Sequence, residues 1–122
     1  MKTGVVIVGA GMGLRLGAEM PKCLIPINDV PIILITANAF QQNTLIEAIV
    51  LVVPEIAVEL IRDKAEELAI DKIYSVVAGG DSRQDSSQYG LRALPNGIDS
   101  VLIHDGASSF FPFSFLSFFF AS

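Results

Sequence analysis

Residues 4–16 read Gly-Val-Val-Ile-Val-Gly-Ala-Gly-Met-Gly-Leu-Arg-Leu, and Pro21-Lys22 follows shortly afterwards. The apolar part, Val5–Val8, predicts a fully buried strand because it is β-branched and unbroken. The glycines after it let backbone N–H groups approach phosphate oxygens, and Arg15 and Lys22 add positive charge. A buried strand that ends in a glycine loop with two cations favours a nucleoside triphosphate as the ligand.

The rest of the chain continues to alternate strands with helices. The apolar runs predict further strands at 48–53, 73–77 and 101–103, with helices at about 31–40, 57–68 and 82–94 and a turn at Asn28-Asp29. On the helix over 57–68, we expect Leu60, Ile61, Ala65 and Leu68 to form the buried face. This alternation predicts an α/β fold with a mostly parallel sheet that is covered by helices on both faces.

In parallel sheets of this kind, ligands bind beyond the carboxyl ends of the strands. Three polar clusters follow strand ends in this sequence, after Val8, after Val77 and after Ile103. We therefore expect these clusters to converge in space, although they are far apart in the sequence.

Composition narrows the class of protein. The chain has 122 residues, of which 52% are hydrophobic, a net charge of −5 and a single cysteine. We expect one globular domain that binds no nucleic acid, since no basic stretch is present. One cysteine forms no internal disulfide and suits a reducing cytoplasm. Met1 leads directly into a strand pattern, so we expect neither a secretory signal nor a membrane anchor.

Two other phosphate-binding motifs fit the first cluster poorly. The dinucleotide fingerprint Gly-x-Gly-x-x-Gly needs a different spacing from Gly9, Gly11 and Gly13. That motif also needs an acidic residue at the end of the next strand, and none is found there. The P-loop sequence Gly-Lys-Ser/Thr is absent. A dinucleotide-binding module remains an alternative that NADH binding without CTP binding would select.

The three clusters together resemble a known family. Residues 11–16 and Pro21-Lys22 are similar to the Gly-x-Gly-x-Arg-Leu and Pro-Lys signature of nucleotidyltransferases that activate sugar or polyol phosphates. Residues 79–86 with Gly90-Leu91 resemble the Gly-Gly-x-x-Arg-x-Asp-Ser stretch of one branch, and 104–107 resemble its His-Asp-Ala-Ala. In this order, the motifs make the chain similar to the 2-C-methyl-D-erythritol 4-phosphate cytidylyltransferases.

The resemblance implies a three-layer αβα, Rossmann-like nucleotidyltransferase fold that is incomplete here, and an enzyme that uses CTP and Mg²⁺. Such an enzyme transfers a cytidylyl group to the polyol phosphate, releases pyrophosphate and serves isoprenoid precursor synthesis. The implied catalytic residues are Arg15 and Lys22. The implied nucleotide-binding residues are Ala10, Gly11, Gly13, Gly80, Asp81, Ser86 and Asp105, with Asp105 also the metal ligand. A ribitol-phosphate cytidylyltransferase and a non-catalytic CTP-binding fragment are the alternatives.

Several of these residues have simpler structural interpretations. Arg15 could pair with Glu19, and Ser86 could be a plain polar residue on its helix. We expect Arg83 and Asp85 to make local contacts at a helix start rather than to touch substrate. We expect His104 to be packed and hydrogen-bonded, and Cys23 to fill space in the core.

The sequence also departs from the family. Members are about twice as long, and their second half holds acceptor-binding residues and the arm that joins a homodimer. Gly9 and Gly106 replace alanines, which we expect to be mild changes, and Ser108 replaces an acceptor-binding arginine. We divide the chain into a nucleotide-binding part, 1–107, and an atypical Phe/Ser-rich tail, 108–122, that holds seven of the eight phenylalanines.

The tail has no charge and shows no lasting helical or strand periodicity. We expect a truncated reading frame, a chain that folds marginally and little turnover of the polyol phosphate. An incomplete sheet would expose a strand edge, which the tail could cover or which could promote aggregation.

Overall fold

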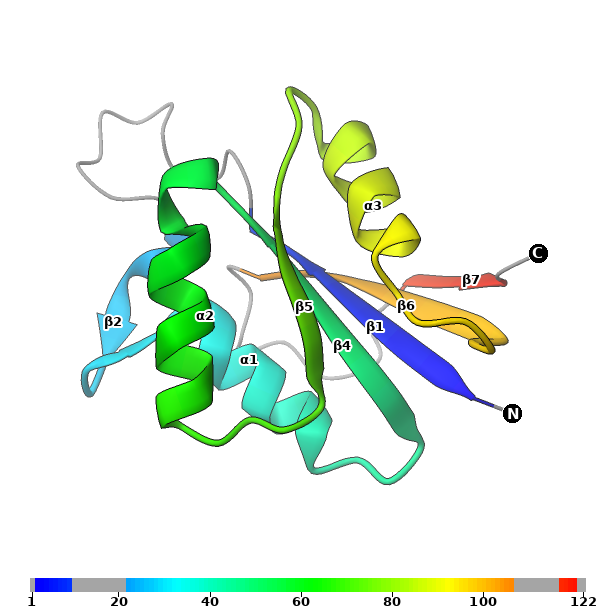
Figure 1. Ribbon diagram of the computed structural model, residues 1–122, viewed down its shortest axis with the longest axis horizontal. Helices are drawn as coiled ribbons and strands as arrows, with labels where there is room; N and C mark the ends of the chain where they lie inside the picture. Colours follow the sequence, from blue (N-terminus) through cyan, green and yellow to red (C-terminus); the bar gives the residue numbers. More distant parts are fainter. Residues whose placement is uncertain (1, 10–21, 107–116, 121–122) are drawn as a thin grey trace.

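A computed structural model describes residues 2–9, 22–106 and 117–120 and contains one central sheet (Figure 1). The strand order is β5-β4-β1-β6-β7. These strands are β1 (Thr3–Val8), β4 (Ile46–Val53), β5 (Ile73–Ala78), β6 (Ser100–Asp105) and β7 (Ser117–Phe120). The first four are mutually parallel and β7 is antiparallel to β6. The prediction of a mostly parallel sheet is therefore confirmed.

Three α-helices form the outer layers. They are α1 (Ile32–Gln41), α2 (Val58–Glu67) and α3 (Arg83–Arg92). Figure 1 shows α1 and α2 on one side of the sheet and α3 on the other. The short 3₁₀ helices η2 (Lys22–Leu24) and η3 (Glu55–Ala57) precede α1 and α2. The predicted three-layer arrangement is confirmed. Among the described residues, no helix has the length and apolarity needed to cross a membrane.

The core lies on both faces of β1. Val5 and Ile7 belong to the cluster under α1 and α2, while Val6 and Val8 belong to the cluster under α3. This division follows from the period of two along a strand, which sends successive side chains to opposite faces. A strand buried on both faces has to be continuously apolar, which is why Val5–Val8 carries no polar residue.

The order of the strands creates a switch point. After β1, the chain forms β4 and β5 on one side of β1. It then passes through α3 and forms β6 on the other side of β1. Ligand crevices of open α/β sheets form where the order reverses, outside the carboxyl ends of the strands. Here that place lies between β1 and β6, where Val8 is level with Asp105.

A small hairpin precedes α1. Its strands are β2 (Pro26–Ile27) and β3 (Val30–Pro31), which pair antiparallel. The two turn residues have positive φ, 52° at Asn28 and 68° at Asp29. Such angles are those of a type I′ turn, which matches the twist of the flanking strands. The turn predicted at Asn28-Asp29 is confirmed, and Pro31 is the N-cap of α1 rather than its first residue.

One expectation about local structure is wrong. On α2, Ile61 and Ala65 are buried, but Leu60 is 58% exposed and Leu68, the C-cap residue, is 38% exposed. The reason is that α2 packs beside β5, the outermost strand on that side, so it buries a narrow stripe only. In the tail, Ser117–Phe120 form β7 along the edge of β6, so this segment covers a strand edge, which was one of the two outcomes expected for the tail. The boundary at residue 107 stays a prediction.

Gly90 allows α3 to approach the sheet closely. A Cβ atom built on Gly90 would overlap Val6 Cγ1 and would lie 2.9 Å from Val52 Cγ2. Replacing a helical glycine by alanine ordinarily stabilises a protein by about 0.5–1 kcal/mol. We expect Gly90→Ala to lower the free energy of unfolding instead, by about 1–3 kcal/mol, because the added methyl overpacks the interface.

Urea unfolding measures this effect. The matched control is Gln88→Ala, an exposed position on the same helix, which should change the free energy of unfolding by less than about 0.5 kcal/mol. Equal stability of Gly90→Ala and the wild-type chain would contradict the close approach of α3.

Candidate functional site

The first residues of the three predicted clusters lie at the carboxyl edge of the sheet. The Gly9 N–H donates to Val52 O at 2.7 Å, the Gly106 N–H to Val8 O at 2.9 Å and the Gly79 N–H to Val53 O at 2.9 Å. Each hydrogen bond extends strand pairing by one residue beyond the end of β1, β6 or β5. The first residues of the three loops are therefore fixed by the sheet itself. Among the described residues, the second and third clusters meet through Arg83 and Asp105, while the convergence of residues 10–21 with them stays a prediction.

The loop before α3 is held by two hydroxyl groups. Ser82 is the N-cap of α3, and its Oγ accepts a hydrogen bond from the Asp85 N–H at 3.0 Å. The Ser86 side chain is buried, and its Oγ accepts from the Gly80 N–H at 3.0 Å. This confirms the cap predicted from Ser82 and Asp85. Ser86 acts on the loop through Gly80, while Asp81 is exposed beside them.

Gly80 lacks a side chain for a steric reason. A Cβ at this position would lie 2.7 Å from Asp85 Cβ and 2.9 Å from the Tyr89 ring. The loop therefore turns tightly against the first turns of α3. This compact turn keeps backbone groups near the mouth of the crevice, which suits recognition of a flat ligand by main-chain atoms and short side chains.

An ion pair connects the second and third motifs. Arg83 Nη1 lies 3.9 Å from Asp105 Oδ2, with side chains 58% and 27% exposed. A pair this exposed contributes little to stability, about 0–1 kcal/mol. Its geometry is informative nonetheless, because Arg83 reaches across the crevice to β6 instead of making the local helix-start contact that the sequence suggested. Sequence reasoning therefore missed that Arg83 borders the site.

His104 lies beneath the site, in the core. Its ring meets Phe40 of α1 edge to face, with centroids 5.4 Å apart. Burial lowers the pKa of His104 below its ordinary value, against a weaker opposing effect of the negative charge on Asp105. The expected packed role is confirmed, but the expected hydrogen bond is not found at Nδ1, which is buried without a partner.

Cys23 occupies the base of the site. Its side chain is buried, as expected for a space-filling residue, and its Sγ lies 3.3 Å from the Gly9 carbonyl oxygen. A Cβ added at Gly9 would lie 2.8 Å from both Cβ and Sγ of Cys23. The expectation that alanine and glycine are nearly equivalent at Gly9 is therefore wrong for this chain.

The remaining predicted residues are placed only in part. Ala10, Gly11, Gly13 and Arg15 lie outside the described residues, and so does Glu19. The backbone of Lys22 opens η2, next to Cys23. The roles of these residues stay predictions.

Metal binding was tested on the described side chains. They contain no group of three or more His, Cys, Asp or Glu residues that could hold an ion. A structural metal centre built from these residues alone does not fit. Mg²⁺ on a nucleotide fits better, because it is usually held by one or two carboxylates together with phosphate oxygens and water. Asp105 is a carboxylate at the carboxyl end of β6, with its side chain 27% exposed.

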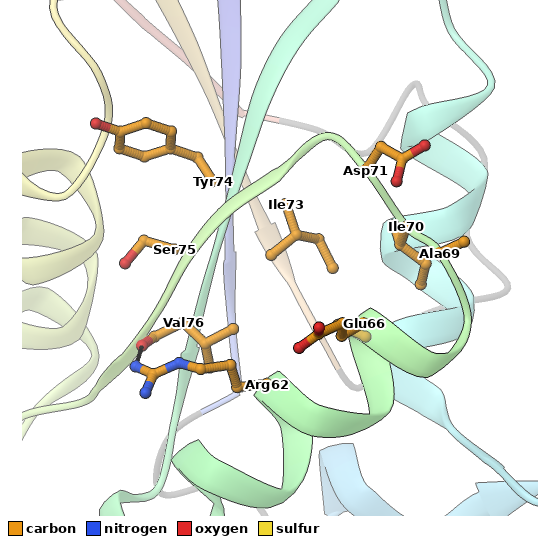
Figure 2. Close-up of a pocket in the computed structure, with 10 residues that line it drawn as sticks. Arg62, Glu66, Ala69, Ile70, Asp71, Ile73, Tyr74, Ser75 and Val76 are labelled. Atoms are coloured by element: carbon orange, nitrogen blue, oxygen red, sulfur yellow. Dashed lines mark hydrogen bonds between the residues drawn. The ribbon is translucent and has the colours of Figure 1, made fainter.

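A separate hollow lies away from this edge. It has a volume of about 320 Å³ and is bordered by α2 and β5 (Figure 2). There, an Arg62 nitrogen donates to the Val76 carbonyl oxygen at 3.2 Å and another pairs with Glu59 at 3.2 Å. Arg62 thus donates a hydrogen bond to a backbone carbonyl of the outer strand β5. None of the predicted site residues that the structure describes borders this hollow.

Comparison with known families gives one extensive match. The family described as IspD, 2-C-methyl-D-erythritol 4-phosphate cytidylyltransferase, matches residues 3–120. The match includes all four parallel strands and continues past residue 107 into the Phe-rich tail. It therefore reaches further than the motif resemblance, which ended near Ala107.

Individual relatives agree with that match. A 2-C-methyl-D-erythritol 4-phosphate cytidylyltransferase of Clostridium botulinum (strain 657 / Type Ba4) is 38% identical over 109 residues, which is 89% of this chain and 48% of that protein. The chain thus spans about half the length of this relative.

Solved structures show the same arrangement. The 4-diphosphocytidyl-2C-methyl-D-erythritol synthase of Anaerococcus prevotii superposes with a TM-score of 0.71 at 29% identity, covering 88% of this chain and 44% of that one. The manganese complex of Rv0371C from Mycobacterium tuberculosis has a similar fold, with a TM-score of 0.60 at 22% identity, covering 90% of this chain and 52% of that one.

The lowered pKa of His104 predicts a pH dependence of stability. Below its ordinary pKa, an imidazole in the unfolded chain takes up a proton that the buried ring resists. The unfolded state then binds more protons, so we expect the free energy of unfolding to fall below pH about 6.5, by at most about 1.4 kcal/mol per pH unit. Urea unfolding between about pH 7.5 and about pH 5.5 measures this slope.

His104→Asn is the control, because His104 is the sole histidine of the sequence. The variant should lose the part of the pH dependence of the free energy of unfolding that comes from the histidine, and keep the part that comes from the carboxyl groups. If both proteins show the same slope over this range, the imidazole titrates alike in the folded and unfolded chain and the expectation is wrong.

Proposed function

The chain belongs to the 2-C-methyl-D-erythritol 4-phosphate cytidylyltransferase family, and we propose that it binds CTP at the carboxyl edge of its sheet. We further propose that the full reaction of this site transfers a cytidylyl group from CTP to 2-C-methyl-D-erythritol 4-phosphate and releases pyrophosphate. The observation that carries the proposal is the placement of Gly9 and Asp105 at the ends of the neighbouring strands β1 and β6, with Arg83 at the start of α3 lying 3.9 Å from Asp105. That edge is where open α/β sheets bind ligands.

The proposed chemistry is a displacement at phosphorus. An oxygen of the polyol phosphate attacks the α-phosphorus of CTP, and the bond to the leaving pyrophosphate breaks as the new P–O bond forms. Negative charge builds on the phosphoryl oxygens and on the leaving group, so the protein mainly positions the partners and neutralises charge. Arg15 offers a planar fork of donors and Lys22 a mobile point charge, and both are proposed to meet this charge.

The loop before α3 is proposed to select the nucleoside. Gly80, Asp81 and Ser86 correspond to family positions around the cytosine and ribose. The contact between Ser86 Oγ and the Gly80 N–H supports this, since it fixes the backbone that leads to Asp81. Ala10, Gly11 and Gly13 are proposed to direct backbone N–H groups to the triphosphate.

Asp105 is the proposed ligand of a divalent metal. A bound Mg²⁺ would neutralise phosphate charge, and the manganese complex of the similarly folded mycobacterial protein is consistent with a divalent ion. Magnesium as the metal, a homodimeric family assembly and a cytoplasmic location are parts of the same proposal, and family resemblance supports them.

Mg²⁺-dependent CTP binding is the first test of this function. We expect saturable binding in calorimetry, with the dissociation constant raised by about 10- to 100-fold in Arg15→Ala and in Lys22→Ala, because each change removes a charged hydrogen-bond donor. Arg92→Ala is the matched control, since Arg92 is an exposed cation at the last turn of α3. A folded wild-type chain that binds no CTP, or equal losses in all three variants, would refute the proposed site.

The Arg83–Asp105 pair generates a second test. Asp105→Asn should raise the Mg²⁺ concentration needed for half-maximal CTP binding by about tenfold or more, because a neutral amide is a weaker ligand for a hard cation. Arg83→Gln removes the cation that competes for Asp105, so we expect it to lower that concentration by up to about fivefold. Titration of Mg²⁺ at fixed CTP measures both values. The assignment of Asp105 fails if Asp105→Asn binds Mg²⁺-CTP like the wild-type chain.

A further inference from the structure

Cys23 and Gly9 lie at the two ends of the glycine-rich segment 10–21. Gly9 is the first residue after β1, and Cys23 follows Lys22 in η2. Cys23 Sγ donates a hydrogen bond to the Gly9 carbonyl oxygen at 3.3 Å, and the cysteine is fully buried. The Gly9 N–H donates to Val52 O at 2.7 Å. Gly9 is thus held by β4 through its N–H and by Cys23 through its carbonyl.

The fit between these two residues is tight. A Cβ on Gly9 would lie 2.8 Å from Cys23 Cβ and Sγ and 3.2 Å from Ile33 Cδ1. Gly9 does not have a positive φ, unlike Gly97. The absence of a side chain at Gly9 therefore serves the close approach of Cys23 rather than an unusual backbone conformation.

The same packing reaches the end of β6. A Cβ on Gly106 would lie 3.0 Å from Ile7 Cγ2 and 3.1 Å from Ile33 Cδ1. Ile33, a fully buried residue of α1, therefore fills the room left by both glycines. We call Gly9, Cys23, Ile33 and Gly106 the strand-end cluster. The cluster brings together Gly9 after β1, Cys23 beside Lys22 and Gly106 beside Asp105.

The thiol has the chemical state that this contact needs. Burial, with a smaller contribution from the negative charge of Asp105, raises the pKa of the Cys23 thiol to about 11. At neutral pH the sulfur keeps its proton and can donate it to the Gly9 carbonyl. A buried, protonated thiol of this kind is chemically inert, so its contribution is geometric.

We propose that Cys23 is a positioning residue of the nucleotide site, which holds Gly9 and thereby fixes the backbone of Lys22 in η2 relative to the end of β1. The inference rests on the proposed CTP site, and it assigns to Cys23 a role that the sequence motifs do not suggest. Since a group that is already positioned loses less freedom when a ligand binds, the cluster should favour nucleotide binding.

The test compares Cys23→Ala, which removes the donor, with Cys23→Ser, which keeps a donor of similar shape. Ile61→Val is the control, because it also removes buried core atoms but lies on α2, outside the cluster. We measure amide hydrogen exchange at residues 22–24 relative to β4, and Mg²⁺-CTP affinity by calorimetry. In Cys23→Ala we expect about three- to tenfold faster exchange at 22–24 and about three- to tenfold weaker CTP binding.

Cys23→Ser should recover most of both losses, and Ile61→Val should change neither. The effect of Lys22→Ala on CTP affinity should also shrink in the Cys23→Ala background, because Lys22 is then no longer held in place. If amide exchange at 22–24 is unchanged in Cys23→Ala, the claim that the contact between Cys23 and Gly9 holds η2 is wrong, whether or not the chain binds CTP. Faster exchange with unchanged CTP affinity overturns the positioning role and leaves the proposed CTP site standing.

Discussion

The placement of β1 between two parallel neighbours determines most of this structure. Val8 is level with Val52 of β4 on one side and with Asp105 of β6 on the other. A shift of one residue in either register would exchange the side chains that pack under α1 and α2 with those that pack under α3, and would break the close fit of Gly90 against Val6. Because both faces of β1 are buried, that register is strongly specified. Gly9 and Gly106, which follow Val8 and Asp105, are consequently held by the sheet at neighbouring strand ends.

Close packing at three glycines fixes the helices and η2 relative to the sheet, and so positions the residues of the site. Gly90 lets α3 lie directly on Val6 and Val52, which places the loop before α3 at the crevice. Gly9 and Gly106 let Cys23 and Ile33 approach the strand ends from the opposite layer. These contacts are steric and apolar, so they act without the screening that weakens charge pairs such as Arg83–Asp105. Close packing therefore acts together with the hydrogen bonds of Ser82, Ser86 and Cys23 in positioning the site.

The sequence was sufficient to predict the layers, the parallel strands and the meeting of the second and third polar clusters, because buried strands and amphipathic helices have distinct periods. It was not sufficient for contacts that depend on which elements become neighbours. The exposure of Leu60 follows from the position of α2 beside the outermost strand β5, and the reach of Arg83 to Asp105 follows from the crossover. The close fit of Gly9 with Cys23 has no local signal at all. The β7 strand was missed because its three consecutive phenylalanines do not alternate with polar residues.

The position of the switch point decides which part of the reaction this half of a family chain can be expected to support. A switch point needs a central strand and one neighbour on each side, and β4, β1 and β6 supply these within the described residues. The loop before α3, which is proposed to select the nucleoside, also lies in this part of the chain. Since the acceptor is expected to need residues from the second half of the family chain, CTP binding and cytidylyl transfer are separable properties of this fold. The proposed binding of CTP by this chain can therefore be tested apart from turnover.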